Sequence, residues 1–155
     1  MTHDSGLTNQ DTDYTRPIQE VLNELQQFAH TAQAVTSPQE LEALERDMRQ
    51  RTDRLGSLLV GHHIQQALDS AALQAEQERL VSQWPKALKS DGQVKVRVRT
   101  VQGYTVPVRV IYYRRKGERR AGKRSAGVYA GLVVLGIYDR CTPALASEVS
   151  LLAAM

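Results

Sequence analysis

The chain has 155 residues, of which 41% are hydrophobic and only 5% aromatic, so it can form one ordinary domain, or two small ones, with an aliphatic core. The single cysteine, Cys141, excludes a disulfide framework and a cysteine-based zinc site within one chain. The N-terminus lacks the pattern of a secretory signal, and the longest apolar run, residues 128–138, is too short to span a bilayer. These features predict a cytoplasmic protein with no membrane partner.

The charge is distributed unevenly along the chain. Residues 1–91 carry 8 Lys/Arg and 14 Asp/Glu, whereas residues 92–155 carry 12 Lys/Arg and 3 Asp/Glu, which gives the net charge of +3. This split predicts a helical first half with an ordinary solvated surface and a second half that binds a polyanion. The alternative is that the two halves neutralise each other by packing together.

The first half is expected to be a disordered tail followed by helices. Residues 1–14 are polar and lack periodicity, which predicts disorder. In the region 15–91, apolar residues recur at helical spacing and predict helices near residues 17–33, 38–60 and 64–83. Ser37, with Glu40 three residues on, forms a capping box that begins the second helix. Trp84-Pro85 ends the third helix.

The second expected helix carries apolar residues at steps of three and four, and Arg51 lies among them. This seam is shorter than the heptad runs of established coiled coils, so it predicts an antiparallel helical hairpin with the first helix. The alternative is a homodimer through residues 38–59, with Arg51 as the polar residue that fixes the register.

Residues 93–113 contain two alternating runs around Gln102-Gly103, which predict a β-hairpin with strands at 93–100 and 104–113. In the first run, valines alternate with lysine and arginine. Pro107 cannot donate to a ladder, so the second strand should lie at an edge or carry a bulge. Tyr112 should share the valine face, and Tyr113 should lie on the opposite face.

The hairpin and the arm that follows it form the candidate DNA-binding region, residues 92–127. A two-stranded ribbon fits the major groove of B-DNA, and lysine and arginine contact phosphates and guanine edges. The glycine-rich, basic run after the hairpin predicts a mobile arm for phosphate contacts. Tyr104, Tyr112 and Tyr113 would either stack on unpaired bases or pack in the core. The candidate DNA-binding residues are Lys95, Arg97, Arg99, Arg109, Arg114, Arg115, Lys116, Arg119, Arg120, Lys123 and Arg124.

The last region, residues 128–155, is expected to hold an apolar segment and a helix. Residues 128–138 predict a buried strand or a short buried segment. Thr142-Pro143 predicts a helix from residue 143, with Thr142 as its cap. Its apolar stripe runs to the last residue, so this region looks truncated. Together these elements predict an α+β fold: a helical hairpin or bundle, then a basic β-hairpin, then a C-terminal helix.

Residues 127–155, GVYAGLVVLGIYDRCTPALASEVSLLAAM, resemble a stretch of the transposases of bacterial insertion sequences of the ISKra type. The resemblance implies the DNA-binding N-terminal portion, or a truncated copy, of a protein that functions in DNA transposition. The family's catalytic domain, of the ribonuclease-H-like DDE type, would lie beyond Met155. The matching residues are Tyr129, Leu132, Leu135, Gly136, Ile137, Asp139, Arg140, Cys141, Thr142, Pro143, Leu145, Ala146, Ser147 and Glu148.

Two positions depart from that family. Many relatives carry a Cys-x-x-Cys-like pair where this chain has residues 114–117, so no metal site is carried over. Ala130 stands where the family often has proline.

No catalytic set is recognised in the chain. The basic half has three scattered acids rather than the convergent carboxylates that two-metal phosphoryl transfer needs. His62 and His63 are neighbours that point apart on a helix, and Cys141 has no histidine near it in sequence. We therefore expect no activity from this chain alone, no cofactor and no metal. The alternative to DNA binding is a helical protein-interaction module with an incidental basic hairpin.

Overall fold

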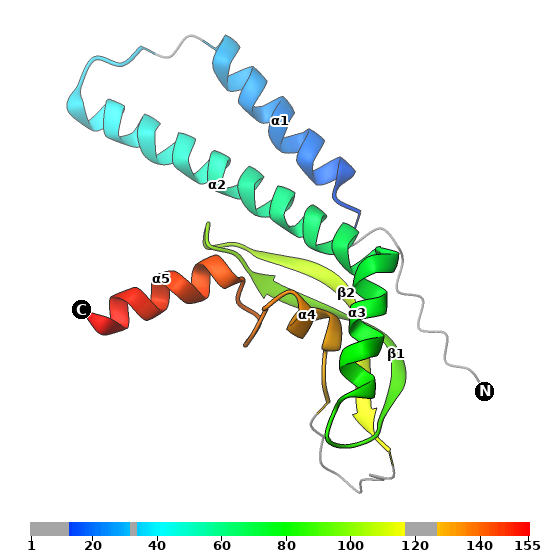
Figure 1. Ribbon diagram of the computed structural model, residues 1–155. Helices are drawn as coiled ribbons and strands as arrows, with labels where there is room; N and C mark the ends of the chain where they lie inside the picture. The colour runs from blue at the N-terminus through cyan, green and yellow to red at the C-terminus, as the bar shows by residue number, and fades with distance from the viewer. Residues whose placement is uncertain (1–12, 32–33, 117–126) are drawn as a thin grey trace, which may run out of the picture.

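The computed structural model describes residues 13–31, 34–116 and 127–155. Their fold is α+β, as predicted: three helices, a two-stranded antiparallel sheet and two further helices (Figure 1). The elements are α1 (Thr15–His30), α2 (Pro38–Asp69), α3 (Ala71–Ser82), β1 (Leu88–Arg99), β2 (Thr105–Arg115), α4 (Ala130–Val134) and α5 (Pro143–Ala154).

The first two helices form the predicted antiparallel hairpin, in which α1 contacts the middle of α2 and the two helices diverge toward the start of α2 (Figure 1). Arg51, which lies in the predicted apolar seam of α2, contacts α1. Its guanidinium donates to Glu24 of α1 at 3.3 Å and to Asp47 of its own helix at 3.1 Å, and it lies 5.6 Å from the centre of the Phe28 ring. The homodimer through residues 38–59 stays a prediction.

The second and third helices divide at a different residue from the one expected. A single helix runs from Pro38 to Asp69, so the break expected near residues 60–64 was wrong. The true break is at Ser70, which has extended backbone angles and whose hydroxyl accepts from the Leu73 N–H at 3.2 Å. The Ser37 cap is confirmed, since its hydroxyl accepts from the Glu40 N–H.

Gly61 lies within α2, and the side chain of Tyr14 packs directly on it. A Cβ at this position would come within 2.8 Å of the Tyr14 ring, so only glycine allows that ring to lie against α2. Tyr14 was expected to belong to the disordered tail, but it is only 3% exposed.

The β-hairpin extends farther than predicted at its open end, and its connecting loop is one residue longer than predicted. Strand β1 begins at Leu88 rather than near residue 93. Thr100 donates its N–H to the Tyr104 carbonyl at 2.9 Å, so the loop has three residues, with Gly103 at φ +92°. The predicted two-residue turn at Gln102-Gly103 was therefore wrong. The loop matches the three-residue class, which places glycine in the left-handed conformation.

A β-bulge in β1 changes which tyrosine faces the core. The register shifts between Ser90 and Gln93, where Asp91 and Gly92 lie opposite Tyr112 alone. As a result Tyr113 is buried at 8% exposure and Tyr112 is only half-buried, the reverse of the face assignment made from simple alternation.

The valine face of the sheet forms the centre of one hydrophobic core. Helices α2, α3 and α4 contribute side chains to the same cluster, so the helical region, the hairpin and the C-terminal segment do not have separate cores. The buried members of this cluster are Tyr14, Leu68, Leu73, Val96, Val98, Val106, Val108, Val110, Leu132 and Ile137.

The outer edge of β2 is covered by groups from the rest of the chain. The Tyr14 hydroxyl donates to the Pro107 carbonyl, and the Gln65 carboxamide bonds both backbone groups of Arg109. Farther along, Tyr113 and Val128 exchange two backbone hydrogen bonds, at 3.0 and 2.9 Å. Pro107 thus lies on an edge strand, as predicted, and its missing N–H leaves no gap in the ladder.

The segment after residue 127 is mostly helix and turn rather than a buried strand. Only Val128 pairs with β2, and residues 130–134 form the short helix α4, so the strand alternative was wrong. The alternative prediction, a short buried segment, is confirmed in part, since Ala130, Leu132 and Ile137 are buried but Tyr138 is 61% exposed. The helix from residue 143 begins where predicted. Among the described residues, no helix has the length and apolarity to cross a membrane.

Stability at high pH should depend on Tyr14. Burial raises the pKa of Tyr14 to about 12, against about 10 in an unfolded chain. The unfolded chain therefore loses its phenolic proton first. The stabilisation is complete below pH about 10 and about 2–3 kcal/mol of it is lost as pH rises to about 12. Urea unfolding across this pH range should show a steeper decline for the wild type than for Tyr14→Phe. Parallel declines would contradict the assignment.

Candidate nucleic-acid interface

Three basic side chains project from one face of β1. Lys95, Arg97 and Arg99 are exposed, while the valines between them face the core. Alternate residues of a strand lie about 6.6 Å apart, so the three cations form an evenly spaced row, here called the basic ribbon. The hydrophobic core beneath holds the strand in place, and the hairpin pairing fixes the direction of each side chain.

The backbone of Arg140 lies beside the end of this row, although the sequence did not indicate Arg140 as a DNA-binding residue. Its carbonyl accepts from the Arg99 N–H at 2.7 Å, and the Arg99 carbonyl accepts from the Thr142 N–H at 3.0 Å. Arg140 is exposed and has φ +60°, next to Asp139 at φ +49°. These two residues turn the chain between Tyr138 and Cys141. The only sequence signal for this position was its charge, because the parallel pairing of residues 99 and 141 joins distant segments.

Arg109 was predicted to belong to the same surface, and it pairs with Lys95 across the two strands, so it lies on the same face of the sheet beside the ribbon. It is half-buried in a polar hollow between β2 and α2, together with Asp13, Tyr14, His62 and Asp69. Its backbone is held by Gln65. Acidic neighbours and partial burial make it a structural cation rather than a free phosphate contact.

The remaining predicted cations gather at the other end of the hairpin or lie outside the described residues. Arg114 is exposed and donates to Asp91 at 2.8 Å, while Arg115 is half-buried and Lys116 is exposed. Lys89, another exposed cation, pairs across the strands with Arg114 and was not predicted. The predicted positions outside the described residues are Arg119, Arg120, Lys123 and Arg124.

The tyrosines are placed for packing rather than for stacking on bases. Tyr113 is buried, and its hydroxyl accepts from Gln77 of α3 at 3.1 Å; burial raises the pKa of Tyr113. The Tyr112 ring lies 5.4 Å from that of Tyr129. Tyr104 is half-buried, with its hydroxyl 3.4 Å from the Gln50 carbonyl. Thus each ring contacts the protein itself.

Much of the acidic charge of the first half is paired inside that half. Arg16–Glu20, Arg46–Glu42, Arg49–Asp53 and Arg79–Glu76 lie within single helices, and Arg51–Glu24 joins α1 to α2. These pairs use helical acids without drawing on the lysines and arginines of the hairpin. One pair does join the two halves, because Arg114 of β2 bonds Asp91.

The other candidate chemistries have little geometric basis. The His62 ring contacts the rings of His63 and Tyr14 edge-on, at 5.7 and 6.3 Å between ring centres. The Cys141 thiol lies 3.6 Å from the Asp139 carbonyl, and its backbone pairs with Arg99 and Tyr138. Within the described ranges, no three His, Cys, Asp or Glu residues gather closely enough to hold a metal ion.

Comparison of this chain with protein-family models, with curated protein sequences and with solved structures finds no match.

Proposed function

We propose that this chain binds double-stranded DNA through the basic ribbon, as the DNA-binding portion of a transposase-like protein. The observation that supports the proposal is the row of Lys95, Arg97 and Arg99 on the solvent face of β1. Arg140 adds an exposed cation whose backbone is hydrogen-bonded to Arg99, at the loop end of the hairpin. The transposase assignment depends on the resemblance of residues 127–155, and DNA binding can be tested without it.

The β-hairpin that carries the basic ribbon has one of the forms in which proteins bind DNA. A two-stranded antiparallel ribbon enters the major groove, where its side chains contact phosphates and base edges. The opposite face of β1 carries Val96 and Val98, which are 3% and 0% exposed, so the hairpin is anchored in the core. An anchored strand holds a guanidinium at a fixed position relative to a base, whereas a chain segment without a core contacts only the backbone.

Binding should weaken steeply with salt. If about five to seven lysines and arginines neutralise phosphates, log K should fall against log salt with a slope of roughly −4.5 to −6. Fluorescence anisotropy of a labelled duplex, titrated with the full chain from about 50 to about 300 mM KCl, measures this slope. The full chain is needed because α2 and α3 contribute Leu68 and Leu73 to the core beneath the hairpin.

A second set of titrations separates duplex binding from general attraction to polyanions. The chain should bind duplex DNA more tightly than poly-glutamate of equal charge, because only the duplex offers a groove of matching width. Equal affinity for both polymers, or a slope near zero, would contradict the proposal.

The alternative is a helical protein-interaction module. It is favoured by exposed leucines on the paired helices: Leu22 of α1 is 38% exposed, and Leu41 and Leu59 of α2 are 47% and 40% exposed. Single exposed leucines are common on protein surfaces, so this observation carries less weight than a regular row of cations. Absence of DNA affinity, together with association that is lost on Leu41→Glu, would support this alternative.

A further inference from the structure

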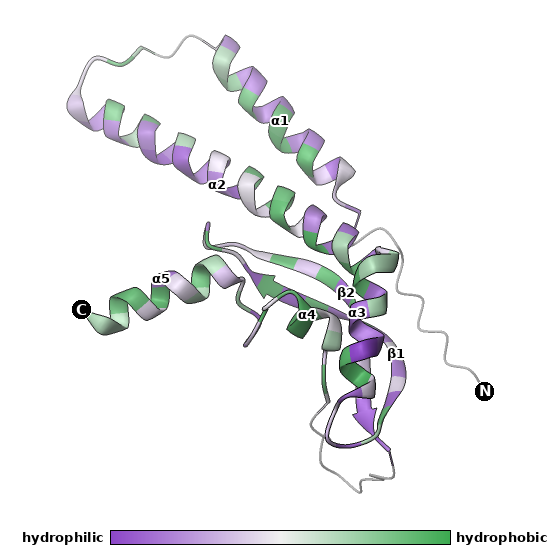
Figure 2. Ribbon diagram, in the orientation of Figure 1, coloured by the Kyte–Doolittle hydropathy of each residue, from purple (hydrophilic) through white to green (hydrophobic). Residues whose placement is uncertain are grey.

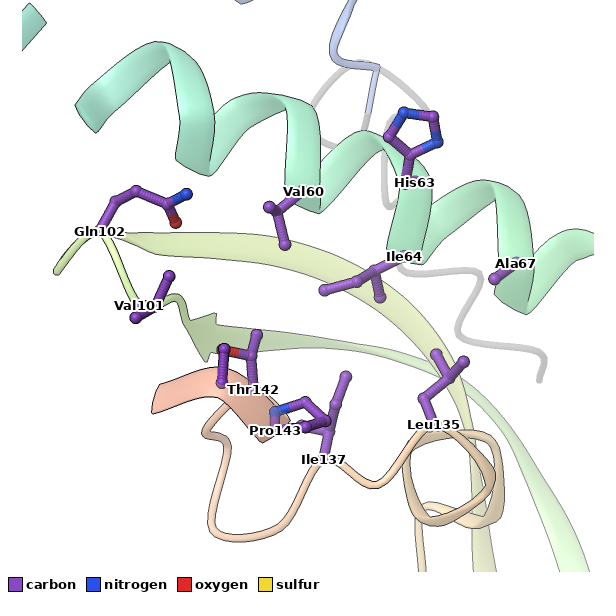
Figure 3. Close-up of a pocket in the computed structure, with 11 residues that line it drawn as sticks. Val60, His63, Ile64, Ala67, Val101, Gln102, Leu135, Ile137, Thr142 and Pro143 are labelled. Atoms are coloured by element: carbon purple, nitrogen blue, oxygen red, sulfur yellow. The ribbon is translucent and has the colours of Figure 1, made fainter. Parts of the chain in front are cut away.

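Two neighbouring apolar surfaces remain uncovered in the described part of the chain. The first is a half-open groove of about 490 Å³, walled by Val60 and Ile64 of α2, Val101 of the hairpin loop, and Leu135, Ile137 and Pro143 (Figure 3). The second is α5, in which no residue is buried. Figure 2 shows α5 as a mostly hydrophobic helix that projects from the rest of the molecule.

The exposure of α5 is large for its side chains. Val149 is 56% exposed, Leu151 68%, Leu152 72% and Met155 102%. Monomeric soluble proteins seldom expose a contiguous apolar patch of this kind, and such patches mark sites of association.

The helix cannot fill the groove of its own chain. Pro143 and Ala144, at the start of α5, form part of the groove wall, and the helix then runs away from it (Figure 1). Twelve helical residues extend about 18 Å, so the last two turns lie well beyond the opening. An α5 that enters this groove must therefore belong to another molecule.

The size of the groove matches what α5 presents. A cavity of roughly 150 Å³, such as truncation of one large apolar side chain leaves, accommodates one benzene-sized group. The groove, at about 490 Å³, therefore accommodates about three aliphatic side chains. Leu145, Val149 and Leu152 form a stripe of three such side chains on one face of α5.

The composition of both surfaces disfavours DNA and anionic lipid as occupants. No Asp, Glu, Lys or Arg lines the groove, and α5 carries a single charge, Glu148. DNA and anionic lipid surfaces are attracted by clustered lysines and arginines, and neither surface has any; His63 is the one ionisable side chain of the groove wall. Two copies of the chain can approach here without repulsion, and each brings a convex and a concave apolar element.

We propose that this chain forms a two-fold symmetric dimer in which α5 of each copy occupies the apolar groove of the other. A two-fold axis makes the contact self-complementary, because one pair of surfaces is used twice. The proposal does not depend on DNA binding, and the basic ribbon takes no part in it.

Sedimentation equilibrium of the full chain tests the proposal. The wild type should show a concentration-dependent mass that reaches twice that of the monomer and no more. Leu152→Glu should weaken dimerisation at least about 100-fold, because it would place a charge in an apolar groove. Ser150→Glu adds the same charge near the same position, but on the opposite face of α5, and should dimerise like the wild type. A wild type that stays monomeric, or equal effects of the two variants, would overturn the proposal.

A mixing experiment distinguishes helix-in-groove contact from pairing of two α5 helices. Val60→Glu alters the groove and leaves α5 intact, and it should weaken dimerisation as Leu152→Glu does. Mixing the two variants restores one intact contact of the two, so heterodimers should form where neither variant associates alone. Ala144→Glu, at the exposed rim, repeats the groove test if Val60→Glu does not fold, as circular dichroism would show. Groove variants that fold and still dimerise like the wild type would contradict the helix-in-groove arrangement.

Discussion

Replacing Lys95, Arg97 and Arg99 together by alanine should weaken binding of the full chain to duplex DNA by roughly 10²–10³-fold at about 0.1 M salt. If each side chain neutralises one phosphate, the slope of log K against log salt falls by about 2.7, which at about 0.1 M corresponds to roughly 500-fold. The three side chains are exposed, so the fold should be retained. Anisotropy titrations at several salt concentrations give both the affinity and the slope.

The matched control removes three cations from another surface. Arg46, Arg49 and Arg54 are exposed on α2, and their replacement by alanine changes the net charge by the same amount. This control should weaken binding only a few-fold, through the general field of the protein. Equal losses in the two triple variants would mean that net charge alone, rather than the ribbon, attracts DNA. Single replacement of Arg97 or Arg99 should in addition relax any sequence preference, if these side chains contact base edges.

The local signals in the sequence were sufficient for much of the fold. Ser37, Pro38 and Glu40 fixed the start of α2 because capping depends on adjacent residues. Pro107 indicated an edge strand because a missing N–H has the same consequence in any sheet. The row of Lys95, Arg97 and Arg99 followed directly from the two-residue period of a strand.

The errors arose where distant residues decide the local structure. A helix break was expected near residues 60–64, whereas Gly61 lies within α2 and Tyr14, far away in sequence, requires a glycine there. The bulge at Asp91 and Gly92 turns Tyr113 toward the core, opposite to the face predicted for it. The sequence signal of this bulge, a glycine after an acid, lies outside the predicted strand 93–100.

In the candidate site, too, local patterns were predicted correctly and contacts between distant residues were not. The ribbon was predicted from alternation alone. The surroundings of Arg109 depend on Asp13 and Asp69, and the position of Arg140 depends on the bridge between Arg99 and Cys141, which are distant in sequence. Charge in a sequence thus identifies cations, and tertiary contacts decide which of them remain at the surface.

Replacing Gln65 by leucine should destabilise the protein by about 2–4 kcal/mol, although leucine fits the space of the glutamine side chain. Gln65 is 5% exposed, and its carboxamide makes the hydrogen bonds to the edge of β2 that a neighbouring strand would otherwise make. It accepts from the Arg109 N–H at 2.8 Å, and its NH₂ group lies 3.4 Å from the Arg109 carbonyl and 3.1 Å from Asp69. Leucine would leave both backbone groups of Arg109 facing an apolar side chain, and each unsatisfied group costs about 1–3 kcal/mol when buried. Urea unfolding should show a lower midpoint with an unchanged slope.

The neighbouring Gln66 supplies the control for this prediction. Gln66 is exposed, so Gln66→Leu makes the same chemical change one residue away without removing a backbone partner, and should alter stability by less than about 0.5 kcal/mol. Gln65→Asn, which keeps the amide but shortens its reach, should lie close to Gln65→Leu, because hydrogen bonding requires the amide to contact the edge of β2. Equal stability of the Gln65→Leu and Gln66→Leu proteins would show that solvent, rather than the Gln65 side chain, satisfies the edge of the hairpin that carries the basic ribbon.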